Sequence, residues 1–169
     1  IKSISGEICK QSPDITMIQE VDKDSRRSYH INQVEKLGKA MDVSEYYYAR
    51  NYKAAFVPYP IPPLGKMDSG IMTISRLKAN SAKRVSLPVS FTWPVRTVNL
   101  KRCLLISRTK VKGTGKELVY INLHLEAYDK GAGKKAQTRA LNRILKQEAA
   151  KGNYVIAAGD FNQTFNNVD

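Results

Sequence analysis

The chain of 169 residues has the size of a single domain, and 42% of its residues are hydrophobic, which is enough to bury a core. Its 28 Lys and Arg residues outnumber its 15 Asp and Glu residues, so the net charge is +13 and polyanions are the favoured partner class. We find no run of roughly 18 apolar residues, no basic and apolar leader, and only two cysteines, which lie far apart. These features exclude a transmembrane bundle, a disulfide scaffold, a collagen and a coiled coil.

The positive charge is spread along the chain in short clusters. The clearest are Lys101-Arg102, Lys110 to Lys116 and Lys130 to Lys135. Each cluster is interpreted either as solvated surface charge that aids solubility or as a contact for a polyanion. The sequence leaves both interpretations open.

The N-terminal part of the chain predicts a helix, a strand and a second helix. The first helix starts at the first residue, ends at Ser12-Pro13-Asp14 and has one apolar face, made of Ile1, Ile4 and Ile8. Residues 15–18 form a short apolar run that is typical of a buried strand, with Gln19-Glu20 at its end. The second helix is indicated by the spacing of Ile31, Val34, Leu37 and Met41.

Residues 46–66 are rich in tyrosine and proline, and four of the seven prolines lie between Pro58 and Pro63. Because proline removes hydrogen-bond donors from a strand, we expect a rigid surface loop over this segment. A short apolar strand follows at residues 71–74, and another is expected at residues 85–91, broken by Pro88.

The C-terminal part predicts a hairpin, a helix and a last strand. Residues 103–109 and 117–125 predict two antiparallel strands, because the short gap between them holds two glycines. A helix that ends near Gly152 is indicated by the shared face of Gln137, Leu141, Ile144, Leu145 and Glu148. Residues 154–158 predict a buried strand. The mixture of helices, strands and a hairpin favours an α+β sandwich with the helices outside over a purely parallel sheet.

Polar residues follow or interrupt three of the apolar runs. Glu20 follows the first strand, His124 lies within the run from 120 to 127, and Asp160 and Asn162 follow the last strand. A charged side chain near a sheet is costly to bury unless it is paired or bound to a metal, and strand ends are where such groups meet at the rim of a crevice. Carboxylate oxygens favour Mg²⁺ or Mn²⁺ over zinc.

Each of these four residues also has a structural interpretation. Glu20 can be a surface carboxylate, His124 a satisfied core histidine, and Asp160 with Asn162 a turn pair. We favour the functional interpretation because of the motifs that surround them. By contrast, we interpret His30 as a structural residue on an exposed helix and Cys9 and Cys103 as buried thiols. Residues 131–135 lack the spacing of a phosphate-binding loop, and we expect a flexible basic loop there.

Four segments resemble motifs of the endonuclease/exonuclease/phosphatase superfamily, the deoxyribonuclease I-like family that also includes neutral sphingomyelinases and inositol-phosphate phosphatases. Residues 13–21, PDITMIQEV, are similar to its first metal motif, and residues 69–76, SGIMTISR, resemble its Ser/Gly-Gly-apolar…Ser-Arg strand. Asn122-Leu123-His124-Leu125 is similar to its Asn-Thr-His-Leu motif, and Gly159-Asp160-Phe161-Asn162 matches its Gly-Asp-Phe-Asn motif. The four segments occur in the order of the family.

The resemblance implies a four-layered α/β/β/α sandwich and metal-dependent hydrolysis of a phosphoester. By position, Glu20 would bind Mg²⁺ or Mn²⁺, and Asp160 would orient or deprotonate the attacking water. Asn162 would hold a phosphate oxygen and help to place Asp160, while His124 would stabilise the phosphoryl group or assist the leaving group. Such a reaction needs positive charge near the phosphoryl group and a water held in line.

The family pattern also contains segments that this chain does not. These are an early strand ending in Asn, a late Asp and a closing Ser-Asp-His. We therefore expect residues 1–169 to form a single, partial catalytic domain that hydrolyses phosphoesters weakly or not at all in isolation.

The sequence leaves the substrate class and the functional class open. The substrate is a nucleic acid, a phospholipid head group or a phosphorylated metabolite. We infer no protein partner and expect a monomer. The sequence leaves the location open, and only analogy with bacterial relatives suggests an extracytoplasmic one. The rival function is a non-catalytic module on the same fold that binds nucleic acid or anionic lipid. A purely structural domain would instead scatter Glu20, His124 and Asp160 over separate surfaces.

Overall fold

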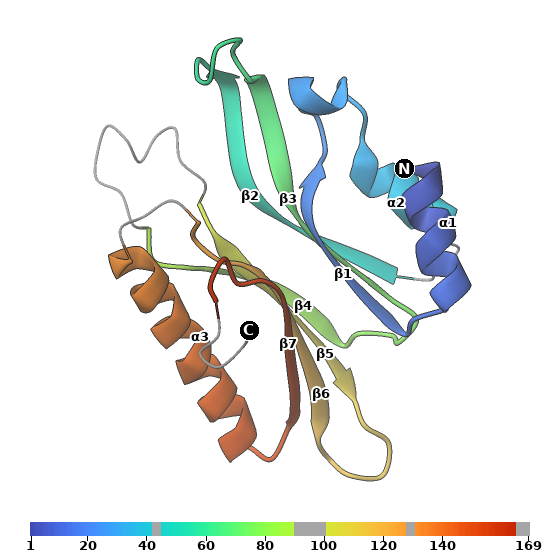
Figure 1. Ribbon diagram of the computed structural model, residues 1–169. Coiled ribbons are helices and arrows are strands. Elements are labelled where there is room, and N and C mark those ends of the chain that lie inside the picture. The colour runs from blue at the N-terminus through green and yellow to red at the C-terminus, as the bar shows by residue number, and fades with distance from the viewer. Residues whose placement is uncertain (42–44, 90–100, 128–130, 165–169) are drawn as a thin grey trace.

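The computed structural model of the chain describes residues 1–41, 45–89, 101–127 and 131–164. Two β-sheets face each other (Figure 1). Helices α1 (Lys2–Gln11) and α2 (Gln33–Ala40) cover the outer side of one sheet, and helix α3 (Ala132–Ala150) covers the outer side of the other. This arrangement is the four-layered α/β/β/α sandwich, so the predicted fold class is confirmed.

The first sheet has the strand order β1-β3-β2 and is antiparallel throughout. Its strands are β1 (Ile15–Asp22), β2 (Glu45–Val57) and β3 (Gly65–Ser75), and a short 3₁₀ helix, η1 (Arg26–Ser28), follows β1. The β2–β3 hairpin extends past the ends of α1 and α2, and η1 contacts its end through Arg26, whose Nη1 donates to the Pro63 carbonyl at 3.4 Å (Figure 1).

The second sheet has the order β4-β5-β6-β7, made of β4 (Ser81–Ser86), β5 (Cys103–Lys110), β6 (Glu117–His124) and β7 (Tyr154–Asp160). The predicted antiparallel hairpin of β5 and β6 is confirmed. Strand β7 pairs with β6 in parallel. A parallel pair needs a long crossover between its strands, and α3 forms this crossover. Among the described residues, no helix combines the length and apolar character that a membrane span requires.

Apolar side chains gather outside each sheet, between the sheets, and near the end of the β2–β3 hairpin, where Tyr52, Val57 and Met67 pack together. Outside the first sheet, Val34 and Leu37 of α2 pack on Met72 and Ile74 of β3. Outside the second sheet, Leu141 of α3 packs on a larger group from β5, β6 and the segment after β4, made of Leu87, Leu104, Ile106, Val119, Ile121 and Leu123. Between the sheets lies a smaller group, made of Ala49, Ile71, Cys103 and Leu105. The helical faces predicted for α2 and α3 are therefore the buried ones.

One polar side chain crosses the layer between the two sheets. Asn122 of β6 is fully buried, and its Nδ2 donates to the carbonyl oxygens of Ile18 at 3.3 Å and Met72 at 2.9 Å. Its Oδ1 accepts a hydrogen bond from Gln19 Nε2 at 2.8 Å. Since these partners lie on β1 and β3, Asn122 connects three strands of two sheets.

The expectation of a surface loop over residues 46–66 is wrong for most of this segment. Strand β2 ends at Val57 and β3 begins at Gly65, so only the proline-rich segment between them lies outside the strands. Tyrosine favours strands, and Tyr48 packs against the helical layer, where its hydroxyl donates to the Val21 carbonyl at 3.4 Å. The prolines are confined to the end of the hairpin, where no ladder partner is needed.

Several smaller expectations are corrected. Strand β4 ends at Ser86 instead of running from 85 to 91, because Pro88 has no donor; residues 90 and 91 lie outside the described residues. Strand β7 is half-exposed, with Tyr154 and Ile156 at 55% and 50% exposure, because α3 covers only one of its faces. Cys9 is exposed, and His30 lies in a turn. The expected flexible loop over residues 131–135 is the first turn of α3, with Gly131 as its N-cap.

Candidate functional site

Glu20 is placed by a bulge in β1. The register of β1 against β3 shifts between Ile18 and Val21, which takes Gln19 and Glu20 out of the regular ladder. Glu20 has a φ of +56°, a backbone conformation that residues other than glycine seldom adopt. Such conformations recur at functional sites. Its side chain is 60% exposed and lines a pocket of about 620 Å³. The bulge therefore turns the carboxylate of Glu20 into this pocket.

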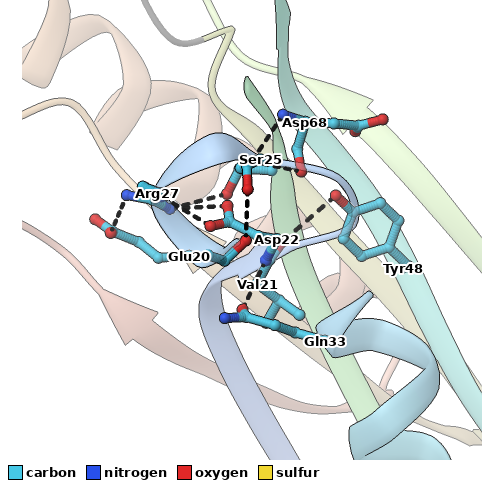
Figure 2. A network of polar contacts seen from close by, with 10 residues as sticks. Glu20, Val21, Asp22, Ser25, Arg27, Gln33, Tyr48 and Asp68 are labelled. Atoms are coloured by element: carbon cyan, nitrogen blue, oxygen red, sulfur yellow. Dashed lines mark hydrogen bonds and ion pairs between the residues drawn. The ribbon is translucent and has the colours of Figure 1, made fainter. Parts of the chain in front are cut away.

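An arginine holds Glu20 in place (Figure 2). Arg27 of η1 donates from Nε and Nη2 to the two carboxylate oxygens of Asp22, at 2.9 and 3.0 Å, and Asp22 is only 2% exposed. Nη1 of Arg27 donates to Glu20 Oε2 at 3.1 Å, and Nη2 of Arg27 also donates to Ser69 Oγ at 3.3 Å. A two-pronged bond to a buried carboxylate fixes a guanidinium in one orientation. Asp22 thus positions Arg27, and Arg27 positions Glu20.

His124 and Asp160 are brought together by the parallel pairing of β6 and β7. They are partners in the register, and His124 Nε2 lies 3.6 Å from Asp160 Oδ2. Gly159 permits this close approach, because its φ of +142° disfavours side chains and a Cβ there would lie 2.0 Å from the carbonyl oxygen of Leu123. The glycine of the Gly-Asp-Phe-Asn segment is therefore required by the backbone geometry.

Asn162 holds the carboxylate of Asp160 from the other side. Its backbone N–H donates to Asp160 Oδ1 at 2.8 Å, and its side-chain Nδ2 donates to the Leu125 carbonyl at 3.0 Å. This local bond from an aspartate to the amide two residues later is a typical Asx turn. Asp160 remains accessible, with its side chain 49% exposed.

The electrostatic environment favours the neutral form of His124. Burial lowers its pKa, and the positive charge of Arg102 lowers it further, against the opposing charges of Asp160, Glu20 and Glu126. Among the described residues, His124 Nδ1 is buried without a hydrogen-bond partner. Burial and Arg102 therefore favour the uncharged imidazole.

The pocket combines a polar end with an apolar wall. Its polar end includes Glu20, Arg27, Ser69, Arg102, His124 and Glu126. The apolar wall comes from the β2–β3 hairpin and consists of Val57, Pro58, Tyr59, Pro60, Leu64 and Met67. Asp160 and Asn162 are not among the lining residues and are connected to the pocket through His124. The structure thus places the four predicted residues in one region, with Glu20 on the first sheet and the other three on the second.

Two further residues at the polar end of the pocket, Arg102 and Glu126, were not among the predicted site residues. Arg102 is 2% exposed and Glu126 is 3% exposed, although the sequence marks both as charged. The interpretation of the Lys101-Arg102 cluster as solvated charge is therefore wrong for Arg102. The only signal was position: Glu126 follows His124 by two residues within an apolar run, and Arg102 directly precedes the buried strand β5.

A sequence profile of the endonuclease/exonuclease/phosphatase family matches residues 4–169. The chain belongs to this family. Among curated proteins, none matches the chain at a significant level.

Solved structures share the fold of this family member. An endonuclease/exonuclease/phosphatase from Beutenbergia cavernae has 22% identity and a TM-score of 0.73, with 95% of this chain and 42% of that chain covered. Truncated Caenorhabditis elegans TDP2 has 17% identity and a TM-score of 0.69, with coverages of 99% and 57%. The human Nocturnin catalytic domain with bound sulfate has 20% identity and a TM-score of 0.59, with coverages of 96% and 56%. The chain thus spans 42% to 57% of the length of these structures.

Proposed function

We propose that this chain carries the catalytic centre of a divalent-metal-dependent phosphoester hydrolase. The observation that supports it is that Glu20 and His124 line one pocket and that His124 is paired with Asp160. Glu20 lies on a bulge at positive φ and is anchored by Arg27, while His124 and Asp160 lie at adjacent ends of parallel strands. A structural domain has no need to orient a carboxylate in this way. Membership of the family points to the same reaction class.

The residues present suit Mg²⁺ or Mn²⁺ better than zinc. Among the described residues, no three His, Cys, Asp or Glu side chains surround a common point as a zinc site would require. Mg²⁺ in phosphoryl-transfer sites is held by one or two carboxylates, with waters and substrate phosphate oxygens as its other ligands. Glu20 would be the carboxylate ligand here. When bound, such a cation offsets the negative charge that develops on the phosphoryl group.

The other residues of the site act on water and on the phosphoryl group. Asp160 accepts a proton from the attacking water, because its Oδ1 is held by the N–H of Asn162 while its Oδ2 faces His124. The neutral imidazole of His124 donates a hydrogen bond to a phosphoryl oxygen or to the leaving group. Arg102 lines the same pocket and supplies a fixed positive charge for an anionic substrate. The nucleic-acid, phospholipid and metabolite classes all offer such a phosphoester.

Hydrolysis of bis(4-nitrophenyl) phosphate tests the proposal. Because the chain is expected to be a partial catalytic domain, we expect only slow turnover with Mg²⁺ or Mn²⁺, its loss with EDTA, and a further fall of about 10² or more in the rate for Asp160→Asn. Asp14→Asn is the matched control, since Asp14 is exposed and precedes the start of β1, whereas Glu20 lies near the end of that strand. Full activity of Asp160→Asn, or activity that survives EDTA, contradicts the mechanism.

A binding measurement keeps the test decisive if turnover is slow. Mn²⁺ broadens the NMR signals of nearby nuclei, so titration should affect residues around Glu20, and Glu20→Gln should weaken this effect. A chain that binds polyanions but neither binds Mn²⁺ nor hydrolyses DNA, sphingomyelin or the model ester would be the non-catalytic binding module.

A further inference from the structure

A second hollow, lined by cations, lies next to the catalytic pocket. It has a volume of about 320 Å³ and is lined by Arg50, Asn51, Tyr52, Lys53, Arg84 and Lys101. Asn51 and Tyr52 also line the catalytic pocket. In addition, Lys101 lines the hollow and the next residue, Arg102, lines the catalytic pocket. The two spaces are therefore neighbours that share a wall.

Two arginines of this basic hollow are held rigidly. Arg50 bonds the buried carboxylate of Asp68 through Nε at 2.7 Å and Nη2 at 3.0 Å. Arg84 reaches from β4 to the first sheet: its Nε donates to the Arg50 carbonyl at 2.8 Å and its Nη2 to the Lys101 carbonyl at 3.3 Å. A guanidinium has five N–H groups, so Arg84 retains donors for a ligand. The position of its charge is set by backbone groups of β2 and of the segment just before β5.

The lysines of the basic hollow are available to a ligand. Lys53 and Lys101 are both exposed, and neither ammonium group is paired with a carboxylate among the described residues. Within the same described residues, no Asp or Glu lines the hollow. Asp68 neutralises Arg50, which leaves the charges of Lys53, Arg84 and Lys101 uncompensated. Like charges that line one hollow repel one another, and an anion placed between them relieves that repulsion.

We propose that the basic hollow is a subsite for a second phosphate group of the substrate. This inference rests on the proposed hydrolase site and names its substrate class: a phosphoester that carries at least one phosphate besides the one that is attacked. A substrate whose reacting phosphate lies beside His124 and Arg102 would place the next phosphate between Lys53, Arg84 and Lys101. A polynucleotide and a polyphosphorylated small molecule both supply this chemistry, whereas a phospholipid with a single phosphodiester does not.

The experiment measures binding without turnover, in EDTA, with two probes. A fluorescently labelled single-stranded oligonucleotide is followed by anisotropy, and inositol hexakisphosphate by calorimetry. The test variant is Lys53→Ala with Lys101→Ala, and the control variant is Arg139→Ala with Lys146→Ala on the exposed face of α3. Both variants lose the same net charge, so only the position differs. Circular dichroism verifies folding, and the pair Lys53→Arg with Lys101→Arg should retain binding.

We expect the test variant to bind the oligonucleotide about tenfold more weakly than the control variant. The slope of log affinity against log salt should fall by about 1.4, since each lost contact to single-stranded nucleic acid contributes about 0.7. A loss confined to inositol hexakisphosphate identifies a polyphosphorylated small molecule as the substrate type. An equal loss in both variants, or no binding of either probe to the unmodified chain, overturns the subsite. Because no hydrolysis is measured, failure of the proposed catalytic function would leave these outcomes unchanged.

Discussion

Replacement of Asn122 by alanine tests the polar connection between the two sheets. The substitution removes the hydrogen bonds to the Met72 and Ile18 carbonyls, at 2.9 and 3.3 Å, and the bond from Gln19 at 2.8 Å. Each such bond stabilises the fold by about 1 kcal/mol net, and buried groups left without a partner add to the loss. We therefore expect the free energy of unfolding to fall by about 3–4 kcal/mol. For a chain of this length, that corresponds to a fall in Tm of roughly 6–16 °C.

Urea unfolding followed by far-UV circular dichroism measures this loss. The midpoint should fall while the m-value stays constant, because the folded surface is unchanged. Asn80→Ala is the matched control: Asn80 is exposed, and its Oδ1 accepts one hydrogen bond from the Lys110 N–H at 2.8 Å. We expect this control to lose less than about 1 kcal/mol. If the two variants lose the same free energy, the buried contacts of Asn122 do not hold the sheets together, and the reasoning is refuted.

Three further results are expected. Gly159→Ala should destabilise the fold by about 3 kcal/mol in urea unfolding, because a Cβ would lie 2.0 Å from the Leu123 carbonyl oxygen; a loss below about 1 kcal/mol would contradict this. Arg108 lowers the pKa of Glu148 from 4.5 to about 2. The contribution of the ionised Glu148 to stability is therefore complete above pH 4.5 and is lost as the pH falls towards 2. Glu148→Gln should therefore reduce the acid sensitivity of Tm between these values, and an unchanged profile would count against the pair. NMR titration should give His124 a pKa below 6.5.

The helices and strands of the core could be predicted because their sequence patterns depend on residues close together in the chain. The spacing of Val34, Leu37 and Met41 reflects the period of a helix that buries one face, and the structure buries these residues. The short gap between β5 and β6 likewise leaves little choice but a hairpin. Residues 46–66 were misread because tyrosine and proline give opposite local signals. Pairing of β2 with the buried strand β3 decided in favour of a strand as far as Val57.

The motifs alone marked Glu20, His124, Asp160 and Asn162 as candidates and indicated the family. The environment of these residues was decided only by the tertiary structure. Arg102 directly precedes β5 and is buried, and its positive charge lowers the pKa of His124, which lies 22 residues further along the chain. The sequence shows which side chains are charged, but the burial and the partners of each side chain depend on segments that meet only after folding. For this reason, the sequence alone indicates the chemistry, whereas the pocket and the basic hollow beside it emerge only from the packing of the two sheets.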